Sequence, residues 1–419
     1  MPLRIKKLIP RKFFILYHFA LSLLGALFYH FPSRNLFVIG VTGTKGKSST
    51  VELINAILEE AGYKTALAST IRFKVADESV PNQFKMTMPG RFFLQQFLRQ
   101  AIAANCTHAI IEMTSEGVLQ SRHQFIDLDA LVFTNITREH IEVHGSFEKY
   151  LAAKLELRNK LEHSAKTPTW MIANTESGYA KDFLEVHAAI PVPFSLHDAE
   201  PYQVRERGID LTFDTLYMHS PLRGTANLEN ILAAATFAKT QNIDRAIIKR
   251  AVERLAVIPG RGELIDEGQS FTVVVDYAHT PESLEQLYEI YKGRKRLCVL
   301  GATGGGRDHW KRPEFGKLAD RNCDVIILTD EDPYDENPRT IVEDIANGIT
   351  KNTPHIEMDR RLAIRNAIER AEPNDVVLIT GKGTDPYIMG PRATRKPWSD
   401  AEVARQELRA QRKRPKRVS

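Results

Sequence analysis

The segment from Val41 to Thr50, VTGTKGKSST, contains the residue types of a loop that binds phosphate groups. The general pattern of such a loop is a glycine, four further residues, and then Gly-Lys followed by Ser or Thr. Gly46, Lys47 and Ser48 match the end of the pattern, whereas Val41 stands where its first glycine is expected. In such a loop backbone N–H groups face the phosphates, the lysine reaches the β- and γ-phosphates, and the serine hydroxyl binds Mg²⁺. We therefore predict a nucleoside triphosphate site here.

Glu112 is a second candidate for this site, because it lies near the end of the apolar run AIIEM at residues 109–113. A carboxylate at the end of a buried strand can bind Mg²⁺ together with the phosphates of a nucleotide. The alternative is a glutamate paired with a cation inside the protein, since an acid is rarely buried without a partner.

The pattern around these residues repeats a buried strand, a turn and a helix, which is typical of an α/β domain with a mainly parallel sheet. The apolar run 36–41 precedes the loop, and a helical pattern that ends at Gly62 follows it. We predict a central ATP-binding domain of the phosphate-loop type over residues 36–258 and a Rossmann-like α/β domain over residues 259–405. The other strands predicted are residues 109–113, 130–135 and 170–174 in the first domain, and 271–278, 296–302, 325–330 and 375–380 in the second.

The charges of the chain gather at its two ends. The net charge is +5, but eleven Lys and Arg residues lie near the ends, so the rest of the chain carries −6. Basic ends on a mildly acidic body indicate contact with anionic lipid or nucleic acid, or else tails that only improve solubility. We expect residues 406–419 to form a basic, disordered tail. The three cysteines form no C-x-x-C pair, so neither a zinc ribbon nor a disulfide framework is indicated, and a reducing cytoplasm fits.

Residues 1–35 combine a basic flank with an apolar run at 13–31. The length of the run would permit a membrane span. The basic flank would then send the following domains outside the cell, where nucleotides are scarce. We therefore favour a helix that lies in the membrane interface, or one that packs on the enzyme. The expected location is cytoplasmic, at the inner face of the membrane if the helix binds lipid.

The motifs along the chain resemble those of the Mur ligase family, whose phosphate loop reads T-G-T-x-G-K-[ST]-[ST] and lacks the usual first glycine. The resemblance runs from about residue 36 to 408. Two of the motifs, DYAHTP and GGxRDxxKRP, are similar to those of the MurE branch, which adds the third amino acid to the peptidoglycan precursor. The further motifs are FTNITREHIEVHGSFEKYLAAKLEL (133–157), RGTANLENILAAATFA (223–238), VVVDYAHTPESLE (273–285), GGGRDHWKRPEFGKLA (304–319) and GKGTDPY (381–387).

The resemblance implies an ATP-dependent ligase that forms an amide bond. Transfer of the γ-phosphoryl group of ATP to a carboxylate makes an acyl phosphate, and the amine of an amino acid then displaces phosphate from it. Such transfers depend on positioning and on neutralisation of charge more than on covalent chemistry by the protein. The residues implied to bind ATP are Gly43, Thr44, Lys45, Gly46, Lys47, Ser48, Ser49, Asn227, Asn230, Arg261, Asp276 and His279.

Within this set the resemblance places Arg261 at the γ-phosphate, Asp276 at the ribose and His279 near the adenine. Because these three belong to the C-terminal domain, the nucleotide would lie between two domains, and catalysis would need them to close. Either Asn227 or Asn230 would contact the adenine, although both could instead cap a helix.

The resemblance also implies Mg²⁺, with two sites, and a further set of catalytic residues. Lys154 matches a lysine that is carbamylated in the family, which turns a cation into an acid that bridges metal ions. Without the resemblance, Lys154 would be a solvated helix lysine and His140 a surface histidine. The implied metal ligands are Ser48, Glu112, His140 and Lys154, and the implied catalytic residues are Lys47, Lys154, His140 and Arg261.

Family members normally begin with a domain that binds the uridine nucleotide of the precursor. Here the apolar segment at residues 13–31 stands before the first strand and the phosphate loop instead. The acceptor is then either not a uridine-linked peptide or is held differently, and a lipid-linked precursor is one hypothesis. Tyr334 replaces the arginine that reads the far carboxylate of diaminopimelate, which favours a cationic amine such as lysine unless the acidic loop is only exposed. The implied acceptor contacts are Thr87, Ser115 and Arg122, and the implied amino-acid contacts are Arg307, Asp332, Tyr334, Gly381 and Asp385.

Three other functions remain open. A folate or polyglutamate ligase would also lack the uridine domain, although such enzymes do not usually carry DYAHTPESLE together with RDHWKRP. A nucleotide-binding subunit of an amidotransferase would not need Lys47, Glu112, His140 and Lys154 together. Binding of nucleic acid through the basic tail has no recognition motif to support it.

Overall fold

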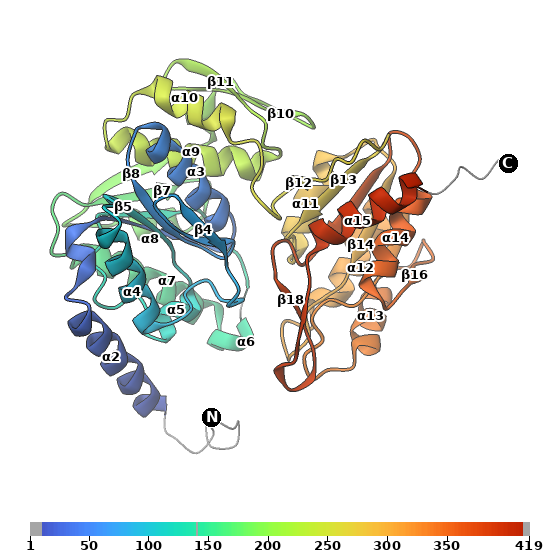
Figure 1. The fold of residues 1–419 in the computed structure, drawn as a ribbon, viewed down its shortest axis with the longest axis horizontal. Helices are drawn as coiled ribbons and strands as arrows, with labels where there is room; N and C mark the ends of the chain where they lie inside the picture. Colours follow the sequence, from blue (N-terminus) through green and yellow to red (C-terminus); the bar gives the residue numbers. More distant parts are fainter. Residues whose placement is uncertain (1–10, 140, 414–419) are drawn as a thin grey trace. The chain divides into compact units, whose positions relative to one another are not determined.

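The computed structural model describes residues 11–139 and 141–413. The chain forms two compact units (Figure 1). The first unit comprises the chain up to Gln203 together with Ile209–Ser220 and Ala226–Leu255. The second comprises Val204–Gly208, Pro221–Thr225 and the chain from Ala256 onward. Two short segments that precede Ala256 therefore belong to the second unit.

An eight-stranded sheet forms the centre of the first unit (Figure 1). Six neighbouring strands are parallel, and two antiparallel strands extend one edge. The strands, in their order across the sheet, are β4 (Glu78–Pro81), β3 (Arg72–Val75), β2 (Thr65–Ala68), β5 (His108–Glu112), β1 (Phe37–Thr42), β6 (Ala130–Phe133), β7 (Trp170–Asn174) and β8 (Ile190–Phe194). Because β1 lies between β5 and β6, the loop after β1 has a strand end on each side.

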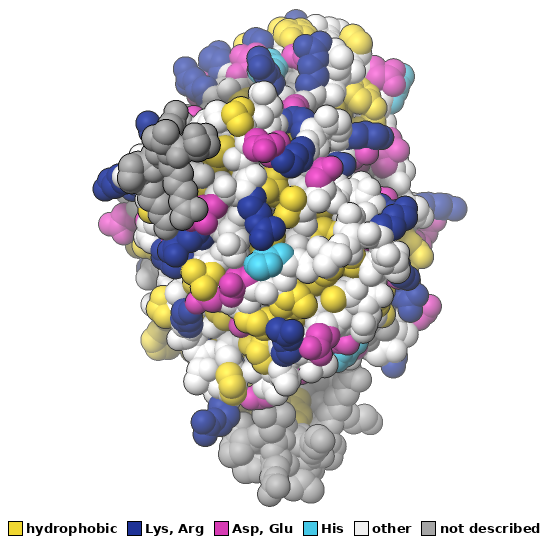
Figure 2. All heavy atoms as spheres, turned by 90° about the vertical axis from the view of Figure 1, so that its right-hand side faces the viewer, with side chains coloured by type: hydrophobic (Ala, Val, Ile, Leu, Met, Phe, Trp, Pro, Cys, Tyr) yellow, Lys and Arg dark blue, Asp and Glu magenta, His cyan; other side chains and the backbone are white. Residues whose placement is uncertain are grey.

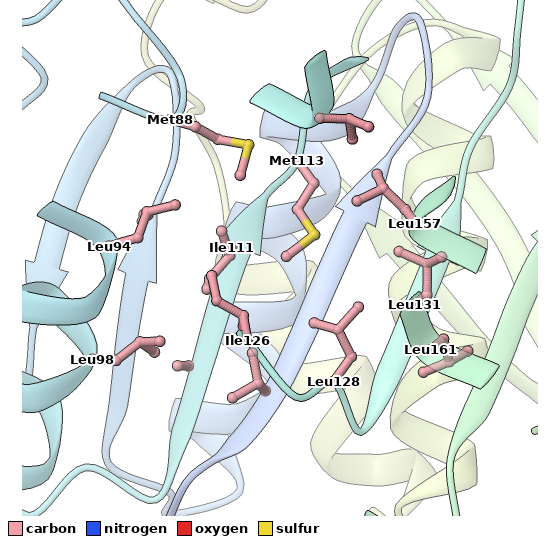
Figure 3. Close-up of a cluster of buried hydrophobic side chains, with 14 of the residues drawn as sticks. Met88, Leu94, Leu98, Ile111, Met113, Ile126, Leu128, Leu131, Leu157 and Leu161 are labelled. Atoms are coloured by element: carbon pink, nitrogen blue, oxygen red, sulfur yellow. The ribbon is translucent and has the colours of Figure 1, made fainter. Parts of the chain in front are cut away.

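Helices cover the sheet because alternate strand side chains are apolar on both faces. Ile111 joins a buried cluster with Leu94 and Leu98 of α4 (Arg91–Ala103), and with leucines of α7 (Phe147–Glu162) (Figure 3). Its neighbour Ile110 is buried on the other face, where α3 (Lys47–Glu60) contacts the sheet. The remaining elements of this part of the chain are α2 (Arg11–Phe28), η1 (Pro32–Asn35), α5 (Ser115–Leu119), α6 (Ile141–His144), α8 (Ala180–Leu184), η2 (Leu196–Ala199), α9 (Thr225–Thr240), α10 (Arg245–Arg254) and a small sheet of β9 (Gln203–Arg205), β10 (Gly208–Phe213) and β11 (Leu216–Ser220).

The second unit has three layers around a six-stranded sheet that is parallel apart from its first strand. The strands, in order, are β12 (Glu263–Leu264), β13 (Thr272–Asp276), β17 (Val376–Thr380), β14 (Arg296–Leu300), β15 (Val325–Leu328) and β16 (His355–Ile356). One face is covered by α11 (Pro281–Ile290), α12 (Lys311–Asn322) and α13 (Pro338–Ala346), and the other by α14 (Arg360–Arg370) and α15 (Asp400–Lys413). A β18 (Tyr387–Met389) and β19 (Arg395–Pro397) pair and η3 (Pro391–Ala393) complete it.

The α/β architecture predicted from the sequence is confirmed. The predicted strand 170–174 coincides with β7, and the other predicted strands overlap β1, β5, β6, β13, β14, β15 and β17. The antiparallel strands β3 and β4 were not predicted, because both are short and lack a continuous apolar run.

The prediction of a disordered tail is wrong for residues 406–413, which continue helix α15. Ala404 and Leu408, one helical turn apart, are buried against the sheet. Their apolar face is narrow, so the many charged residues around it concealed the helix in the sequence. Residues 414–419 lie outside the described residues.

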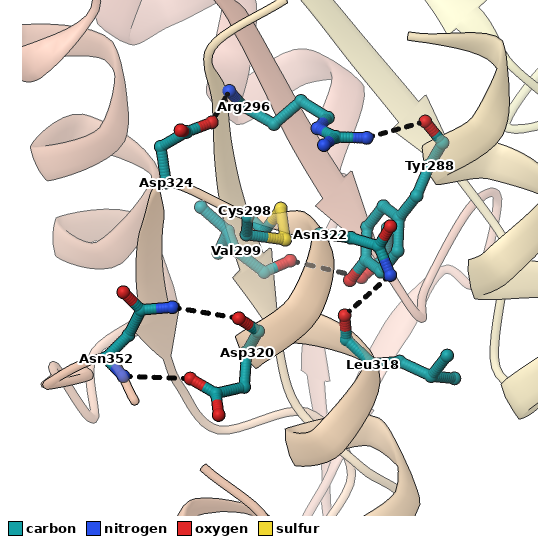
Figure 4. The surroundings of a disulfide bond; sticks show 11 residues. Tyr288, Arg296, Cys298, Val299, Leu318, Asp320, Asn322, Asp324 and Asn352 are labelled. Carbon is teal, nitrogen blue, oxygen red and sulfur yellow. Dashed lines mark hydrogen bonds between the residues drawn. A yellow bond between two sulfur atoms is a disulfide. The ribbon is translucent and has the colours of Figure 1, made fainter. Parts of the chain in front are cut away.

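The cysteine spacing indicated no disulfide framework, but the structure contains one disulfide. Cys298 on β14 forms a disulfide with Cys323, which directly follows α12, and Cys106 remains a buried free thiol (Figure 4). The two bonded residues are 25 positions apart in the chain. They meet because α12 packs back onto the strand, a tertiary arrangement that cysteine spacing alone does not reveal.

The apolar segment near the start forms helix α2, which packs against α4. In the described part of the chain, no helix is long and apolar enough to cross a membrane.

The surface charge is mixed in sign on the face that Figure 2 presents, where Lys and Arg side chains are interspersed with Asp and Glu.

Candidate active site

The phosphate loop connects β1 to α3, the strand–loop–helix context that its sequence predicted. Val41 is fully buried and pairs with Glu112 of β5, so the position of the missing glycine belongs to the strand. The glycines that the loop needs are Gly43 and Gly46, which have φ values of 153° and 79°. A Cβ atom on Gly43 would lie 2.0 Å from Thr134 Oγ1, and one on Gly46 would lie 2.2 Å from Asn230 Oδ1.

Residues that follow β6 hold the loop from one side. The backbone N–H of Thr44 donates to the Asn135 carbonyl at 2.8 Å, and that of Lys45 donates to Asn135 Oδ1 at 3.0 Å. Thr134 Oγ1 donates to the Lys45 carbonyl at 2.6 Å, and the Tyr150 hydroxyl lies 2.8 Å from Thr44 Oγ1. The motif at residues 133–157 therefore shapes the loop at residues 42–49.

Two lysine side chains face this loop. Lys47 Nζ donates to the carbonyls of Gly43 and Thr44, both at 2.9 Å, and Lys154 Nζ donates to the Gly43 carbonyl at 2.7 Å. Helix α3 begins at Lys47 with no acidic residue in its first turn, so its N-terminus is also electropositive. The loop thus combines features that bind a polyphosphate.

Lys154 is not the solvated lysine that its helix position alone would suggest, because only 1% of it is exposed. Burial and the nearby charge of Lys47 lower the pKa of Lys154 well below its usual value, against the opposing effect of Glu139 and Glu112. The Nζ atom also lies 5.0 Å from the centre of the Tyr150 ring. The amine therefore faces the loop in a largely enclosed environment.

Glu112 lies in a cluster of hydroxyl groups beside the loop and is 2% exposed. Ser48 Oγ donates to Glu112 Oε2 at 3.0 Å, and the backbone N–H of Thr70 donates to the same oxygen at 2.8 Å. Thr70 Oγ1 donates to Glu112 Oε1 at 3.0 Å. Thr87 Oγ1 lies 2.7 Å from Thr70 Oγ1. Oxygen ligands of this kind suit Mg²⁺, which binds oxygen at about 2.1 Å, so that one ion could contact both Ser48 and Glu112.

The other predicted metal ligand, His140, lies outside the described residues. Within residues 11–139 and 141–413, no group of three or more His, Cys, Asp or Glu side chains could hold a metal ion. A Mg²⁺ ion at Glu112 would therefore depend on hydroxyl and phosphate oxygens as well.

The predicted adenine contacts lie against the loop. Asn230 Nδ2 donates to Asn227 Oδ1 at 3.2 Å, and Thr50 Oγ1 donates to Asn230 Oδ1 at 3.2 Å. The alternative that these asparagines cap a helix is wrong, because α9 begins at Thr225 and both lie inside it. Gly46 provides the space that Asn230 occupies.

Of the predicted acceptor contacts, Thr87 is linked to the Glu112 cluster, and Ser115 and Arg122 have partners of their own. Thr87 joins the cluster through Thr70, and Ser115 Oγ lies 3.1 Å from His144 Nε2. Arg122 is 6% exposed, and it donates to the Met88 carbonyl and, at 2.6 Å, to Gln120 Oε1. Burial, with a smaller effect of Arg91, lowers the pKa of Arg122 to about 10.

In the second unit, the predicted nucleotide contacts lie on two neighbouring loops, one at residues 260–262 and one at residues 276–279. Asp276 accepts hydrogen bonds from the N–H groups of Gly262, at 2.6 Å, and Ala278, at 2.7 Å. The Arg261 guanidinium lies 4.2 Å from the centre of the Tyr277 ring, and His279 Nδ1 lies 2.8 Å from the Tyr277 carbonyl. These residues follow the ends of strands, where α/β sheets bind ligands.

Two further glycines allow the loops of the second unit to touch. A Cβ atom on Gly260 would lie 2.6 Å from the backbone of Gly383, and one on Gly381 would lie 2.1 Å from Glu331 Oε2. The segment IPGRGE thereby packs directly on GKGTD.

The predicted amino-acid contacts divide into a buried and an accessible group. Lys382 is fully buried and donates to both carboxylate oxygens of Asp332 at 2.9 Å, while Asp385 lies 3.5 Å from the same Nζ. Tyr334 and Arg307 are less buried, with the guanidinium 6.0 Å from the ring centre. Asp332 therefore orders the loop, and the accessible side chains are better placed to meet a substrate.

Comparisons with known proteins agree with this arrangement. The sequence profile of the Mur ligase middle domain matches residues 41–238, and that of the Mur ligase glutamate ligase domain matches residues 260–383. The UDP-N-acetylmuramoyl-L-alanyl-D-glutamate–2,6-diaminopimelate ligase of Syntrophomonas wolfei is 35% identical over 383 residues, which make up 88% of this chain and 77% of that protein. The chain belongs to the Mur ligase family.

Solved structures support the fold of this Mur ligase. A structure of a UDP-N-acetylmuramoyl-L-alanyl-D-glutamate–2,6-diaminopimelate ligase, 28% identical, superposes with a TM-score of 0.60 over 90% of this chain and 79% of the other. The folylpolyglutamate synthase of Mycobacterium tuberculosis superposes with a TM-score of 0.69 over 95% and 96%, but at 15% identity it shows the fold alone. As a Mur ligase, the chain is an ATP-dependent ligase of the acid–amino-acid class, and Mur ligases generally use Mg²⁺.

Sequence reasoning missed several residues of the Mur ligase site. Thr134, Asn135 and Tyr150 hold the loop and lie inside a motif that the sequence did reveal, so they could have been proposed. Thr70 follows β2 and has no such signal, because only the neighbouring position of β2 and β5 brings it to Glu112.

Substitution of Gly46 by alanine is expected to weaken ATP binding at least about tenfold, because the positive φ and the contact with Asn230 both oppose a side chain. Isothermal titration calorimetry with Mg²⁺ and ATP would measure the change. Gly62→Ala is the matched control, since Gly62 has a φ of 86° but open space around its Cβ position. Equal affinity in both variants would contradict the proposed loop geometry.

Proposed function

We propose that this Mur ligase joins an amino acid to the peptide of a peptidoglycan precursor through an acyl-phosphate intermediate. The observation that supports the proposal most is the convergence of Lys47, Ser48, Glu112 and Lys154 on one loop. Bound Mg²⁺·ATP would supply the γ-phosphoryl group that activates the acceptor carboxylate.

Different side chains would bind the phosphates, the metal ions and the rest of the nucleotide. The N–H groups at the start of α3 and the Lys47 ammonium hold the phosphates and neutralise charge that develops during transfer. Ser48 and Glu112 would hold one Mg²⁺, and His140 and Lys154 the second. Arg261, Asp276 and His279 of the second unit are the further side chains proposed to bind the nucleotide.

Carbamylation of Lys154 belongs to this proposal. A carbamate forms from a neutral amine and CO₂, and burial of the side chain favours the neutral amine. The resulting carboxylate would place a negative charge beside Lys47 and could bind the second Mg²⁺. Intact-protein mass spectrometry under gentle conditions would detect the added mass of one CO₂, which Lys154→Arg should abolish.

The acceptor and the amino acid are the finer parts of the proposal. The relatives act on a uridine-linked peptide and diaminopimelate by name. Here Arg11–Phe28 form the apolar helix α2, which favours a lipid-linked acceptor in the cytoplasm at the inner face of the membrane. Tyr334 in place of an arginine, beside several acids, favours a monocarboxylic amino acid with a cationic side chain.

Phosphate release in the presence of ATP, Mg²⁺, an acceptor and an amino acid tests these statements together. We expect release only when both the acceptor peptide and the amino acid are present, with lysine preferred over diaminopimelate by at least about tenfold. The Tyr334→Arg variant should shift the preference toward diaminopimelate. Release with folate and glutamate in place of the precursor would overturn the proposal in favour of a polyglutamate ligase. Equal rates with uridine-linked and lipid-linked acceptors would count against the lipid-linked substrate.

A further inference from the structure

Helix α2 attaches to its unit through one narrow face. Ser22 Oγ donates to the Ser121 carbonyl at 2.7 Å, and Ala26 is fully buried. Gly25 faces α4, where its Cβ position lies 3.5 Å from Phe92 Cα, an ordinary contact distance. Small residues therefore fix the helix to the protein through this side.

The opposite face of α2 is apolar and exposed. Leu16, Leu24 and Leu27 follow helical spacing, with exposed fractions of 63%, 54% and 51%. Phe28, at 69%, extends this stripe. Figure 1 shows α2 extending away from the sheet of the first unit. A stripe of this kind on one helix is more than scattered surface apolar residues, and it indicates a binding surface.

The charge of the surrounding sequence specifies the partner. The first 51 residues contain no Asp or Glu, and eight Lys or Arg. Five of these precede or begin the helix, namely Arg4, Lys6, Lys7, Arg11 and Lys12. An exposed apolar helix face preceded by basic residues is typical of helices that bind anionic membranes, where each basic residue near the surface adds about 1 kcal/mol.

We propose that α2 lies in the headgroup region of an anionic lipid bilayer, with Leu16, Leu24, Leu27 and Phe28 directed into the acyl chains. The helix would lie parallel to the surface, because its other face is occupied by α4 and cannot also contact lipid.

The same helix leads to the proposed acceptor contacts through α4 and its neighbours. His18 of α2 contacts Arg91, the first residue of α4, and Arg91 donates to Gln120 Oε1 at 3.5 Å. Gln120 Oε1 also accepts from Arg122 at 2.6 Å. A membrane-bound α2 would thus hold Arg122 close to the lipid surface. This second step rests on the proposed function, whereas the binding of α2 to lipid does not.

Sedimentation of the full chain with vesicles tests the binding step. We expect binding to vesicles of phosphatidylglycerol and phosphatidylcholine, weaker binding as salt rises, and little binding to pure phosphatidylcholine. The double variant Leu24→Glu/Leu27→Glu should lower the affinity at least about tenfold, since two apolar side chains would no longer enter the bilayer. Leu362→Glu, on an exposed leucine of α14, is the matched control and should bind as the parent chain does.

Two outcomes would overturn the inference. The double variant could bind vesicles like the parent chain, or the parent chain could remain in the supernatant with anionic vesicles. Light scattering covers the second case: self-association that the double variant abolishes would show that another copy of the chain covers α2. Thermal unfolding and ATP affinity of the double variant should match the parent chain, which separates a loss of lipid binding from a loss of folding or of nucleotide binding.

Discussion

Replacement of Lys47 by alanine should lower ATP-dependent phosphate release by about 10³-fold or more. The ammonium lies over the loop and contacts the carbonyls of Gly43 and Thr44, within reach of the position that the phosphates would take. Removal of this charge leaves the γ-phosphoryl group without its proposed neutralising partner. The measurement is phosphate release at saturating acceptor and amino acid, with Mg²⁺ and ATP varied.

Two controls make this result specific. Lys181→Ala removes a lysine whose side chain is 87% exposed on the first unit, and its rate should equal that of the parent chain. The thermal unfolding of the Lys47→Ala protein should be close to that of the parent, because the hydrogen bonds from Lys47 to the Gly43 and Thr44 carbonyls lie within one loop. A rate within several-fold of the parent would reject the role of the loop in catalysis.

The second large effect concerns stability: Arg360→Met should lower the free energy of unfolding of the second unit by about 3–5 kcal/mol. Arg360 donates two hydrogen bonds, at 2.8 and 2.7 Å, to Asp400, and both side chains are almost fully buried. It also donates to the Thr380 carbonyl at 2.7 Å. Methionine fills much of the volume but leaves a buried carboxylate without its cation.

Guanidinium unfolding followed by tryptophan fluorescence would measure this loss. The matched control is Arg339→Met, because Arg339 and Glu343 form an exposed pair on α13 that should contribute less than about 1 kcal/mol. The double variant Arg360→Met/Asp400→Leu should be more stable than the single variant, since it removes the isolated charge. If Arg360→Met and Arg339→Met lower the free energy of unfolding equally, the buried pair has no special role.

Much of the fold could be predicted because its signals are local. The runs that became β1, β7 and β14 are apolar for the length of a buried strand, and each ends in polar or glycine-rich residues. The short strands β3 and β4 and the helix over residues 406–413 carry weak local patterns. Their structure depends on tertiary partners, so the sequence did not reveal them.

The candidate site shows the same division. The loop, Glu112 and Lys154 were found because the first two have characteristic neighbours and the third lies in a motif of the family. No sequence pattern indicated Thr70, because only the pairing of β2 with β5 brings its hydroxyl to Glu112. His140 and the specificity of Tyr334 stay predictions.

Segments Val204–Gly208 and Pro221–Thr225 have a practical consequence for dissecting the protein. Within the second unit, Arg294 forms an ion pair with Glu206, and Arg223 donates to the Glu206 carbonyl at 2.7 Å. A gene fragment that starts at Ala256 would encode the whole second sheet but neither of these segments. Expressed alone, such a fragment would leave Arg294 without its acid and uncover the apolar side of Ile290 where Gly224 packs. Boundaries chosen from the sheet alone would therefore omit two segments that belong to the second unit.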